Sequence, residues 1–231
     1  MSIDIFDKYD IRARMCALLF VLAPMLLDGY IMIDAFRNIT FTILLASLIL
    51  AYSCLFSCWI RFCGNKLDSK NDYIVDFLMP DSEEFSKSSL KRYYERLSKL
   101  EPSFSELLAF DKNKTQKILK DVSCWLKQKT RDEKFRLIRE ENINYGFMRN
   151  VYSLKKAFLV MFSIYSLILC AFLGIEIHNN SFEEVLSARI FACCIVHLIS
   201  YFIWIFGVTK RILDFIAKKY AREVVAAIDR L

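Results

Sequence analysis

Apolar residues gather in two long blocks of the chain, at roughly 15–61 and 157–208, and the segment between them is charged. A helix needs about 20 apolar residues to cross the hydrocarbon core of a bilayer, so each block is long enough for two crossings. We therefore predict an all-α integral membrane protein with four transmembrane helices and a helical cytoplasmic domain inserted between spans 2 and 3. The predicted spans lie near 14–34, 39–60, 156–175 and 188–208.

The first predicted span is interrupted by Asp28 and Gly29. A carboxylate inside the bilayer needs a partner or water, which makes Asp28 a candidate intramembrane polar residue. The alternative, which the sequence favours, is that the helix ends there in an Asp-Gly turn and leaves Asp28 at the surface. The residues before this span are more acidic than basic and no small-residue cleavage site follows, so we expect a permanent span rather than a signal peptide.

Helix-start signals divide the charged middle segment. Three pairs fit the capping-box pattern: Asp81 with Glu84, Ser103 with Glu106, and Thr130 with Glu133. They predict helices near 82–100, 103–110, 114–129 and 131–148.

The chain ends in a further amphipathic pattern after the fourth span. One face of this predicted helix is apolar, with Leu213, Ile216, Tyr220, Val224, Ala227 and Leu231. Such a face requires a partner, and symmetric self-association supplies one, so we expect a homo-oligomer in which these helices meet below the membrane. The resulting domain prediction is an N-terminal transmembrane hairpin at 1–61, a cytoplasmic helical domain at 62–155, a C-terminal transmembrane hairpin at 156–208 and a cytoplasmic helix at 209–231.

Composition and charge agree with a membrane protein and suggest its orientation. Hydrophobic residues make up 55% of the chain, mean hydropathy is +0.30, and there are only 5 Gly and 3 Pro. Residues 61–156 hold 21 Lys and Arg against 15 Asp and Glu, whereas the two short loops between spans hold one Arg and no Lys. The positive-inside rule then places both termini and residues 62–155 on the cytoplasmic side of the membrane.

Two interpretations fit the charged stretch before the third span, where nine ionised side chains lie within 130–150. A charged helix joined to a membrane span through a hinge at Gly146 is what a gated pore requires. The plainer interpretation is a solvated juxtamembrane helix with i, i+4 pairs such as Arg136 with Glu140.

Basic residues of the middle segment form a candidate ligand-binding surface, with aromatic residues between them. This combination is typical of proteins that neutralise phosphates and stack on bases, although topology and anionic lipid also make juxtamembrane regions basic. The interleaved aromatic residues are Tyr93, Tyr94, Trp125 and Phe135. The candidate ligand-binding residues are Lys91, Arg92, Arg96, Lys127, Lys129, Arg131, Arg136 and Arg139.

Polar residues inside the spans are further candidates. His197 lies in the fourth span, where it either follows an ion path or hydrogen-bonds across a helix pair. Ser47 belongs to a stripe of small residues on the second span, with Thr40, Ala51, Cys54 and Cys58, which fits helix packing or a pore lining. The cysteines lack a His companion and a paired C-x-x-C, so we expect no metal. No catalytic motif is present, so we expect neither an enzyme nor a cofactor.

The segments DKYDIRAR before the first span and KTRDEKFRLIREENINYGFMRN before the third, with a basic helix after the fourth, resemble a group of small bacterial four-span proteins. Among defence-associated membrane proteins, the architecture is similar to the membrane effectors of the Hailong anti-phage system. That resemblance implies an oligomeric, ligand-gated pore that arrests or kills the infected cell, controlled by single-stranded DNA from a partner nucleotidyltransferase. The basic cytoplasmic helices would then bind the oligonucleotide.

Two hypotheses follow for the function. The first is an oligomeric membrane effector that forms a gated ion-conducting pore under the control of a nucleotide or single-stranded DNA. The second is a non-conducting membrane anchor or scaffold whose cytoplasmic helices recruit a protein partner.

Overall fold

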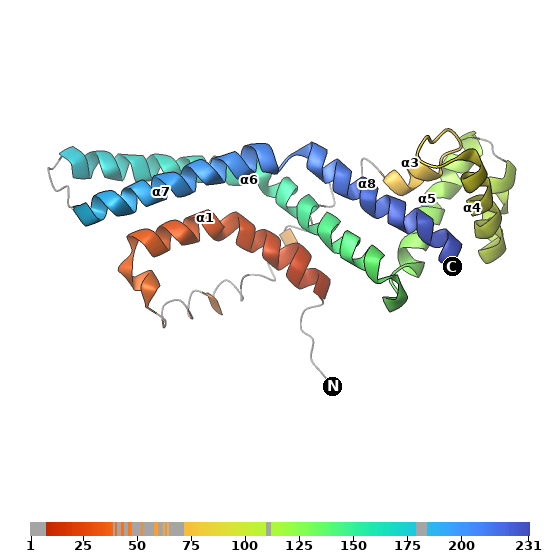
Figure 1. Ribbon diagram of the computed structural model, residues 1–231, viewed down its shortest axis with the longest axis horizontal. Coiled ribbons are helices and arrows are strands. Elements are labelled where there is room, and N and C mark those ends of the chain that lie inside the picture. Colours follow the sequence, from red (N-terminus) through yellow and green to blue (C-terminus); the bar gives the residue numbers. More distant parts are fainter. Residues whose placement is uncertain are drawn as a thin grey trace. The chain divides into compact units, whose positions relative to one another are not determined.

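The computed structural model contains only helices as secondary structure in the part of the chain that it describes (Figure 1). It divides into two compact units, each made from two stretches of chain: unit 1 from Met1–Leu67 and Gly146–Leu213, and unit 2 from Asp68–Tyr145 and Asp214–Leu231. The residues described are 8–38, 40, 43, 46, 47, 52, 58, 59, 62, 64, 72–109, 112–178 and 184–231.

Three helices are long and apolar enough to cross a membrane, among the described residues. They cover Asp10–Met32, the apolar part of Glu133–Ile175, and Ala188–Gly207. These helices agree with the first, third and fourth predicted spans. The second predicted span, 39–60, lies outside the described residues apart from isolated positions.

Unit 1 is built from the apolar helices. A π-helical turn, η1 (Asp10–Met15), leads into α1 (Cys16–Met32), and the short 3-10 helix η2 (Asp34–Arg37) follows it. The long helix α6 (Arg136–His178) contributes its residues from Gly146 onward. Next to that part of α6 lies α7 (Glu184–Phe202), extended by the π-helical turn η5 (Ile203–Gly207) (Figure 1).

Polar side chains donate hydrogen bonds to backbone carbonyl groups at the two π-helical turns of unit 1. Lys155 of α6 donates from Nζ to the carbonyl oxygens of Ile205 (3.1 Å) and Val208 (2.7 Å), at the C-terminal end of η5. Asn150 donates from Nδ2 to the carbonyl oxygen of Ala13 in η1 (2.8 Å). Buried backbone groups without such partners are costly, so these bonds make the two π-helical turns tolerable inside the unit.

Unit 2 is a small helical domain around one apolar core. Its elements are α3 (Tyr73–Leu78), α4 (Lys87–Leu100), η3 (Pro102–Ala109), α5 (Lys112–Lys129), η4 (Glu133–Phe135), the start of α6, most of α8 (Lys210–Ala226) and η6 (Ala227–Arg230). The core contains fully buried side chains from several of these helices, including Leu78, Leu97, Leu126 and Val224. Val122 and Leu126 of α5 are both fully buried in this core.

The C-terminal apolar face does not need a second subunit to cover it. Val224, Ala227 and Ile228 are all fully buried within the core of unit 2. The partner that this face requires is supplied by the chain itself, so the face no longer argues for self-association.

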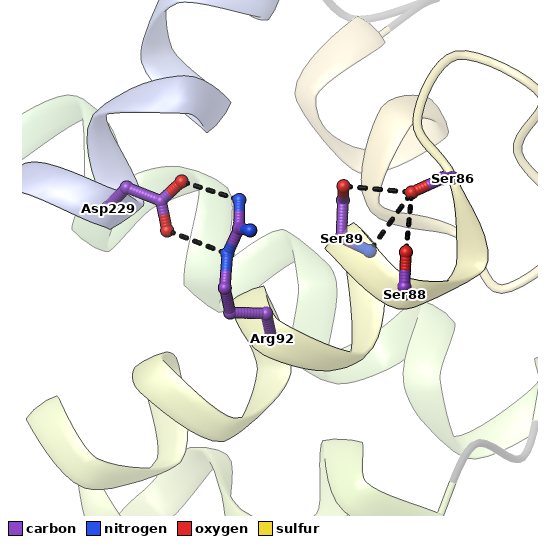
Figure 2. Close-up of polar contacts among 5 residues, drawn as sticks. All are labelled: Ser86, Ser88, Ser89, Arg92 and Asp229. Carbon is purple, nitrogen blue, oxygen red and sulfur yellow. Dashed lines mark hydrogen bonds and ion pairs between the residues drawn. The ribbon is translucent and has the colours of Figure 1, made fainter.

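Helix starts in unit 2 differ from the capping-box predictions. Helix α4 begins at Lys87 rather than near 82, because Ser86 is its N-cap and accepts a hydrogen bond from the backbone N–H of Ser89 (3.2 Å; Figure 2). Thr130 does not cap the following helix, since its hydroxyl donates to the carbonyl of Leu126 in the preceding one (2.7 Å). Asp132 takes the cap position instead and accepts from the N–H of Lys134 (3.2 Å).

Of the two remaining helix predictions, 114–129 agrees with α5 (Lys112–Lys129), whereas the predicted helix at 103–110 is the 3-10 helix η3. Helix α3 was not predicted. Helix α3 has only 6 residues, too few to show a periodic pattern.

Asp72 ties α3 to α5. It caps α3 by accepting from the N–H of Ile74 (3.2 Å), and its Oδ2 accepts from Ser123 (2.7 Å) and Lys127 (2.9 Å). Burial raises the pKa of Asp72, but the hydrogen bonds from Lys127 and Ser123 outweigh it and leave the pKa below its ordinary value of 3.8. The ionised form therefore stabilises the folded unit.

Asp72→Ala is expected to lower the free energy of unfolding of unit 2 by about 1–2 kcal/mol at neutral pH, through the lost cap and a half-exposed ion pair. Because the folded-state pKa is lowered, this stabilisation is present above the unfolded-state pKa and is lost as pH falls through the folded-state pKa. Denaturant unfolding of the detergent-solubilised protein, followed by circular dichroism, measures the loss. Asp72→Asn keeps a side chain that can cap the helix and should therefore lose less stability. If Asp72→Ala lowers the free energy of unfolding equally at neutral and acidic pH, this account is contradicted.

Candidate functional site

Two of the candidate polar residues meet inside unit 1. Asp28 of α1 is fully buried, and its Oδ2 lies 2.7 Å from Nε2 of His197 on α7, which is 8% exposed. The prediction that favoured a surface position for Asp28 was wrong, because α1 continues through Asp28 and Gly29 to Met32. Gly29 allows close packing there, since a Cβ at that position would lie 2.9 Å from the ring of Phe36.

The Asp28–His197 pair continues as a chain of hydrogen bonds. Nδ1 of His197 lies 2.8 Å from Oγ of Ser166 on α6, and that Oγ lies 3.2 Å from Oη of Tyr201 on α7. Tyr201 in turn donates to Oγ of Ser163 (3.1 Å), an exposed residue one turn earlier on α6. The polar chain of Asp28, His197, Ser166, Tyr201 and Ser163 thus joins all three apolar helices and runs from a buried carboxylate to the surface of the unit.

Aromatic rings enclose the imidazole of His197. The buried ring of Phe162 lies 4.6 Å from it, centroid to centroid, and Phe158 stacks on Phe162 at 5.0 Å. Trp204 of η5 stacks on Phe158 at 3.9 Å. Among the described residues, His197 makes polar contacts with Asp28 and Ser166, and a histidine between apolar helices requires such partners.

Asp28, His197 and Ser166 are the residue types of a nucleophilic triad, but the surroundings of Ser166 do not suit that chemistry. Its hydroxyl donates to the carbonyl of Phe162, one turn earlier in the same helix (2.8 Å). Backbone N–H groups in the interior of a helix are already bonded, so none lies ready to stabilise an oxyanion beside a mid-helix serine. That the protein is not an enzyme stays a prediction. The five hydrogen-bonded polar residues are better suited to holding charge or protons.

Sequence reasoning missed Ser163 and Ser166. They lie three residues apart in the third apolar run, on one helix face. That spacing could have identified them. Serine hydroxyls in a membrane helix usually donate to a carbonyl of their own helix, however, so they are seldom read as functional residues. Ser47, in the second predicted span, does this: its Oγ donates to the carbonyl of Ile43 (2.8 Å).

Gly146, the predicted hinge, is the first residue of unit 1 along α6, which is continuous through this position. A Cβ added to Gly146 would lie 2.8 Å from Cζ of Tyr9 and 3.2 Å from Cβ of Ala13. Gly146 therefore lets the N-terminal helix approach α6 closely. Its action as a hinge stays a prediction.

Gly146→Ala is expected to destabilise the protein by about 1–3 kcal/mol, because the new methyl group overpacks the contact with Tyr9. The midpoint of thermal unfolding in detergent measures this. Gly174→Ala is the matched control, since nothing lies within 4 Å of a Cβ at Gly174. If the contact with Tyr9 causes the loss, adding Tyr9→Ala to Gly146→Ala should restore much of the lost stability. If Gly146 acts as a hinge without packing against Tyr9, the second substitution should restore none.

The candidate ligand-binding residues of unit 2 do not form one site. Lys91, Arg92 and Arg96 are exposed on α4, and a surface hollow of about 310 Å³ is lined by Arg92, Glu95, Arg96, Lys99 and Leu100. Arg92 also makes a two-point contact with Asp229 of η6, from Nε (3.2 Å) and from Nη2 (2.8 Å; Figure 2). The hydrogen bond to Asp229 raises the pKa of Arg92.

The other candidate basic residues lie on α5, on α6 and, for Arg131, in the turn between α5 and η4. Lys127 is bound to Asp72, and Lys129 lies over the ring of Trp125 at 5.6 Å. Arg131 and Arg136 are exposed, and Arg139 is half-buried. None of these five lines the hollow on α4.

The predicted base-stacking platform was wrong. Tyr93, Tyr94 and Phe135 are buried in the core of unit 2, and the hydroxyl of Tyr94 donates to the carbonyl of Leu78. Burial raises the pKa of Tyr94 above its ordinary range. Trp125 is half-buried against Phe104 at 5.8 Å. Three of these four interleaved rings are therefore not available for base stacking.

Cysteine chemistry adds nothing to the site. The described cysteines, among them Cys16, Cys58 and Cys193, are free, and the described residues include no group of three or more His, Cys, Asp or Glu side chains placed to hold a metal ion. Cys54 and Cys63 lie outside the described residues.

No protein-family model matches the chain, and no curated protein or solved structure is significantly similar to it. The function is therefore argued from the residues themselves.

Proposed function

We propose that the chain is one subunit of a homo-oligomeric membrane effector that forms a gated ion-conducting pore in the bacterial cell membrane. The observation that supports this most strongly is the pair of ionisable side chains, Asp28 and His197, buried 2.7 Å apart between apolar helices. Such side chains are expensive in lipid, face protein or water, and usually mark ion or proton pathways. A role in anti-phage defence and a partner nucleotidyltransferase rest on the resemblance alone.

The water-exposed unit supplies the control in this proposal. Helix α6 runs without interruption from Arg136 in unit 2 to His178 in unit 1, so a force on its first turns acts on the helix that carries Ser163 and Ser166. Rigid helices that join a ligand-binding part to a membrane part are a common means of gating. Lys219 of α8 fastens the first turns of α6 by an ion pair with the buried Glu141 (2.8 Å).

The proposed ligand is a nucleotide or single-stranded DNA, made by a partner nucleotidyltransferase. Three cations around the hollow on α4, Arg92, Arg96 and Lys99, are suited to phosphate groups. Because the neighbouring aromatic rings are buried, contacts to phosphate rather than base stacking should hold the ligand. Binding should therefore weaken steeply with salt and differ little between base sequences.

The proposal is tested by following membrane potential with a voltage-sensitive dye in bacteria that express the protein alone. Without a ligand to restrain the pore, the wild-type protein is expected to depolarise the cells. Asp28→Asn should abolish depolarisation at the same membrane level, whereas Asp121→Asn, the same change at an exposed position of α5, should not. A steady potential with the wild-type protein would favour the alternative, a non-conducting membrane anchor or scaffold.

A further inference from the structure

The hydrogen bonds of Ser166 indicate where the protons of His197 lie. A carbonyl oxygen can only accept, so the single hydroxyl hydrogen of Ser166 points to Phe162 (2.8 Å). Tyr201 donates its own hydrogen to Ser163 (3.1 Å), and either hydroxyl can be the donor in its contact with Ser166 (3.2 Å). With the Ser166 hydrogen on Phe162, Nδ1 of His197 is the donor in its 2.8 Å contact with Oγ of Ser166.

The contact between His197 and Asp28 requires one more hydrogen. Two lone pairs would repel at 2.7 Å, so a hydrogen lies between Nε2 and Oδ2. With Nδ1 protonated as well, the pair has no net charge, whichever of the two atoms holds the shared hydrogen. An uncharged pair suits the apolar surroundings, because a single unpaired charge there is costly.

We propose that the Asp28–His197 pair is a proton-binding site inside the membrane, and that Ser166, Tyr201 and Ser163 form the path by which its proton leaves and returns. The ion that acts on the proposed pore is then a proton. The role of this proton in conduction rests on the proposed function. The bound species is a proton, and no other ligand is needed.

Each transfer along the path is balanced. Nδ1 of His197 gives its proton to Oγ of Ser166 while the hydrogen of Ser166 passes to Oη of Tyr201. The phenolic hydrogen of Tyr201 passes to Ser163, which gives up its own hydrogen to the water of the proposed pore. Loss of the proton leaves a neutral imidazole whose Nε2–H still donates to the ionised Asp28, so the helix contact survives in both states.

Other titratable groups face the pair from two helices. Tyr165 of α6 and Cys193 of α7 lie near the carboxylate of Asp28, and Tyr201 of α7 lies near Ser166. All three are uncharged when protonated. In that form they add no charge beside the Asp28–His197 pair.

Nuclear magnetic resonance of nitrogen-15-labelled histidine tests the site directly. The chain has only two histidines, so His178→Gln in the full-length protein leaves His197 as the sole imidazole signal. In lipid nanodiscs at neutral pH, both ring nitrogens of His197 are expected to show protonated or proton-sharing shifts. Asp28→Asn should change the signal to that of a neutral imidazole.

Two further variants separate the path from the site. Ser166→Ala and Tyr201→Phe should slow exchange of the Nδ1 proton with deuterated water by about tenfold or more while Nε2 remains hydrogen-bonded to Asp28. A bare Nδ1 at neutral pH, or exchange unchanged in both variants, would overturn the proposal. None of these measurements requires the protein to conduct ions. If His197 is protonated at both nitrogens but the protein passes no current, the proposed pore is refuted and the proposed proton-binding site is not.

Discussion

Replacing His197 with leucine is expected to lower the free energy of unfolding by about 3–5 kcal/mol, one of the two largest effects of any single substitution proposed for this chain. The variant leaves the carboxylate of Asp28 with 0% exposure and without the imidazole 2.7 Å away. An unpaired buried charge costs more than the pair contributes, because it must be neutralised or hydrated inside an apolar layer. Resistance to unfolding in sodium dodecyl sulfate titrations measures the loss.

Two controls sharpen this prediction. His178→Leu makes the same chemical change at the exposed end of α6 and should alter stability little. The double variant Asp28→Leu with His197→Leu should be more stable than His197→Leu alone, since it removes the stranded charge. A double variant that is as unstable as the sum of the two single variants would contradict a direct interaction between them.

Trp204→Ala is expected to cost a similar amount, about 3–5 kcal/mol, because it leaves a large cavity in unit 1. Trp204 is 1% exposed, stacks on Phe158 at 3.9 Å and packs against Phe20 of α1 at 5.4 Å. It therefore joins the same three apolar helices as the polar chain, by apolar contacts instead of hydrogen bonds. Thermal unfolding in detergent, followed by circular dichroism, measures the effect.

Trp204→Phe preserves part of the ring stack and should lose less than half of the stability that Trp204→Ala loses. Phe206→Ala, at an exposed position of the same π-helical turn, controls for changes in detergent contact. Equal stability of Trp204→Ala and Phe206→Ala would show that the stack does not hold the helices together.

The apolar helices were predictable because length and hydropathy are local properties of a sequence. Three predicted spans coincide with Asp10–Met32, part of Glu133–Ile175, and Ala188–Gly207. The continuation of α1 through Asp28 and Gly29 was not predictable in the same way. It depends on His197, which lies 169 positions away. Each polar residue was recognised alone, and only the folded structure could show that they form a pair.

For unit 2, the sequence predicted the all-helical class correctly but placed several helix starts at the wrong residues. Several serine and aspartate side chains compete for each cap, and the sequence does not show which of Asp81 or Ser86 accepts the bond. The burial of Tyr93 and Tyr94 had a signal that was missed. They lie between Leu90 and Leu97 at helical spacing, on the face that enters the core.

The measurement that tests the account most directly is current through planar bilayers containing the purified full-length protein, with and without added short single-stranded DNA. We predict discrete conductance steps without DNA, their suppression when DNA is added, and their loss in Asp28→Asn but not in Asp121→Asn. Bilayers that stay silent in both conditions, with protein shown to be inserted, would contradict the pore. Steps that are unchanged in Asp28→Asn would remove the Asp28–His197 pair from it.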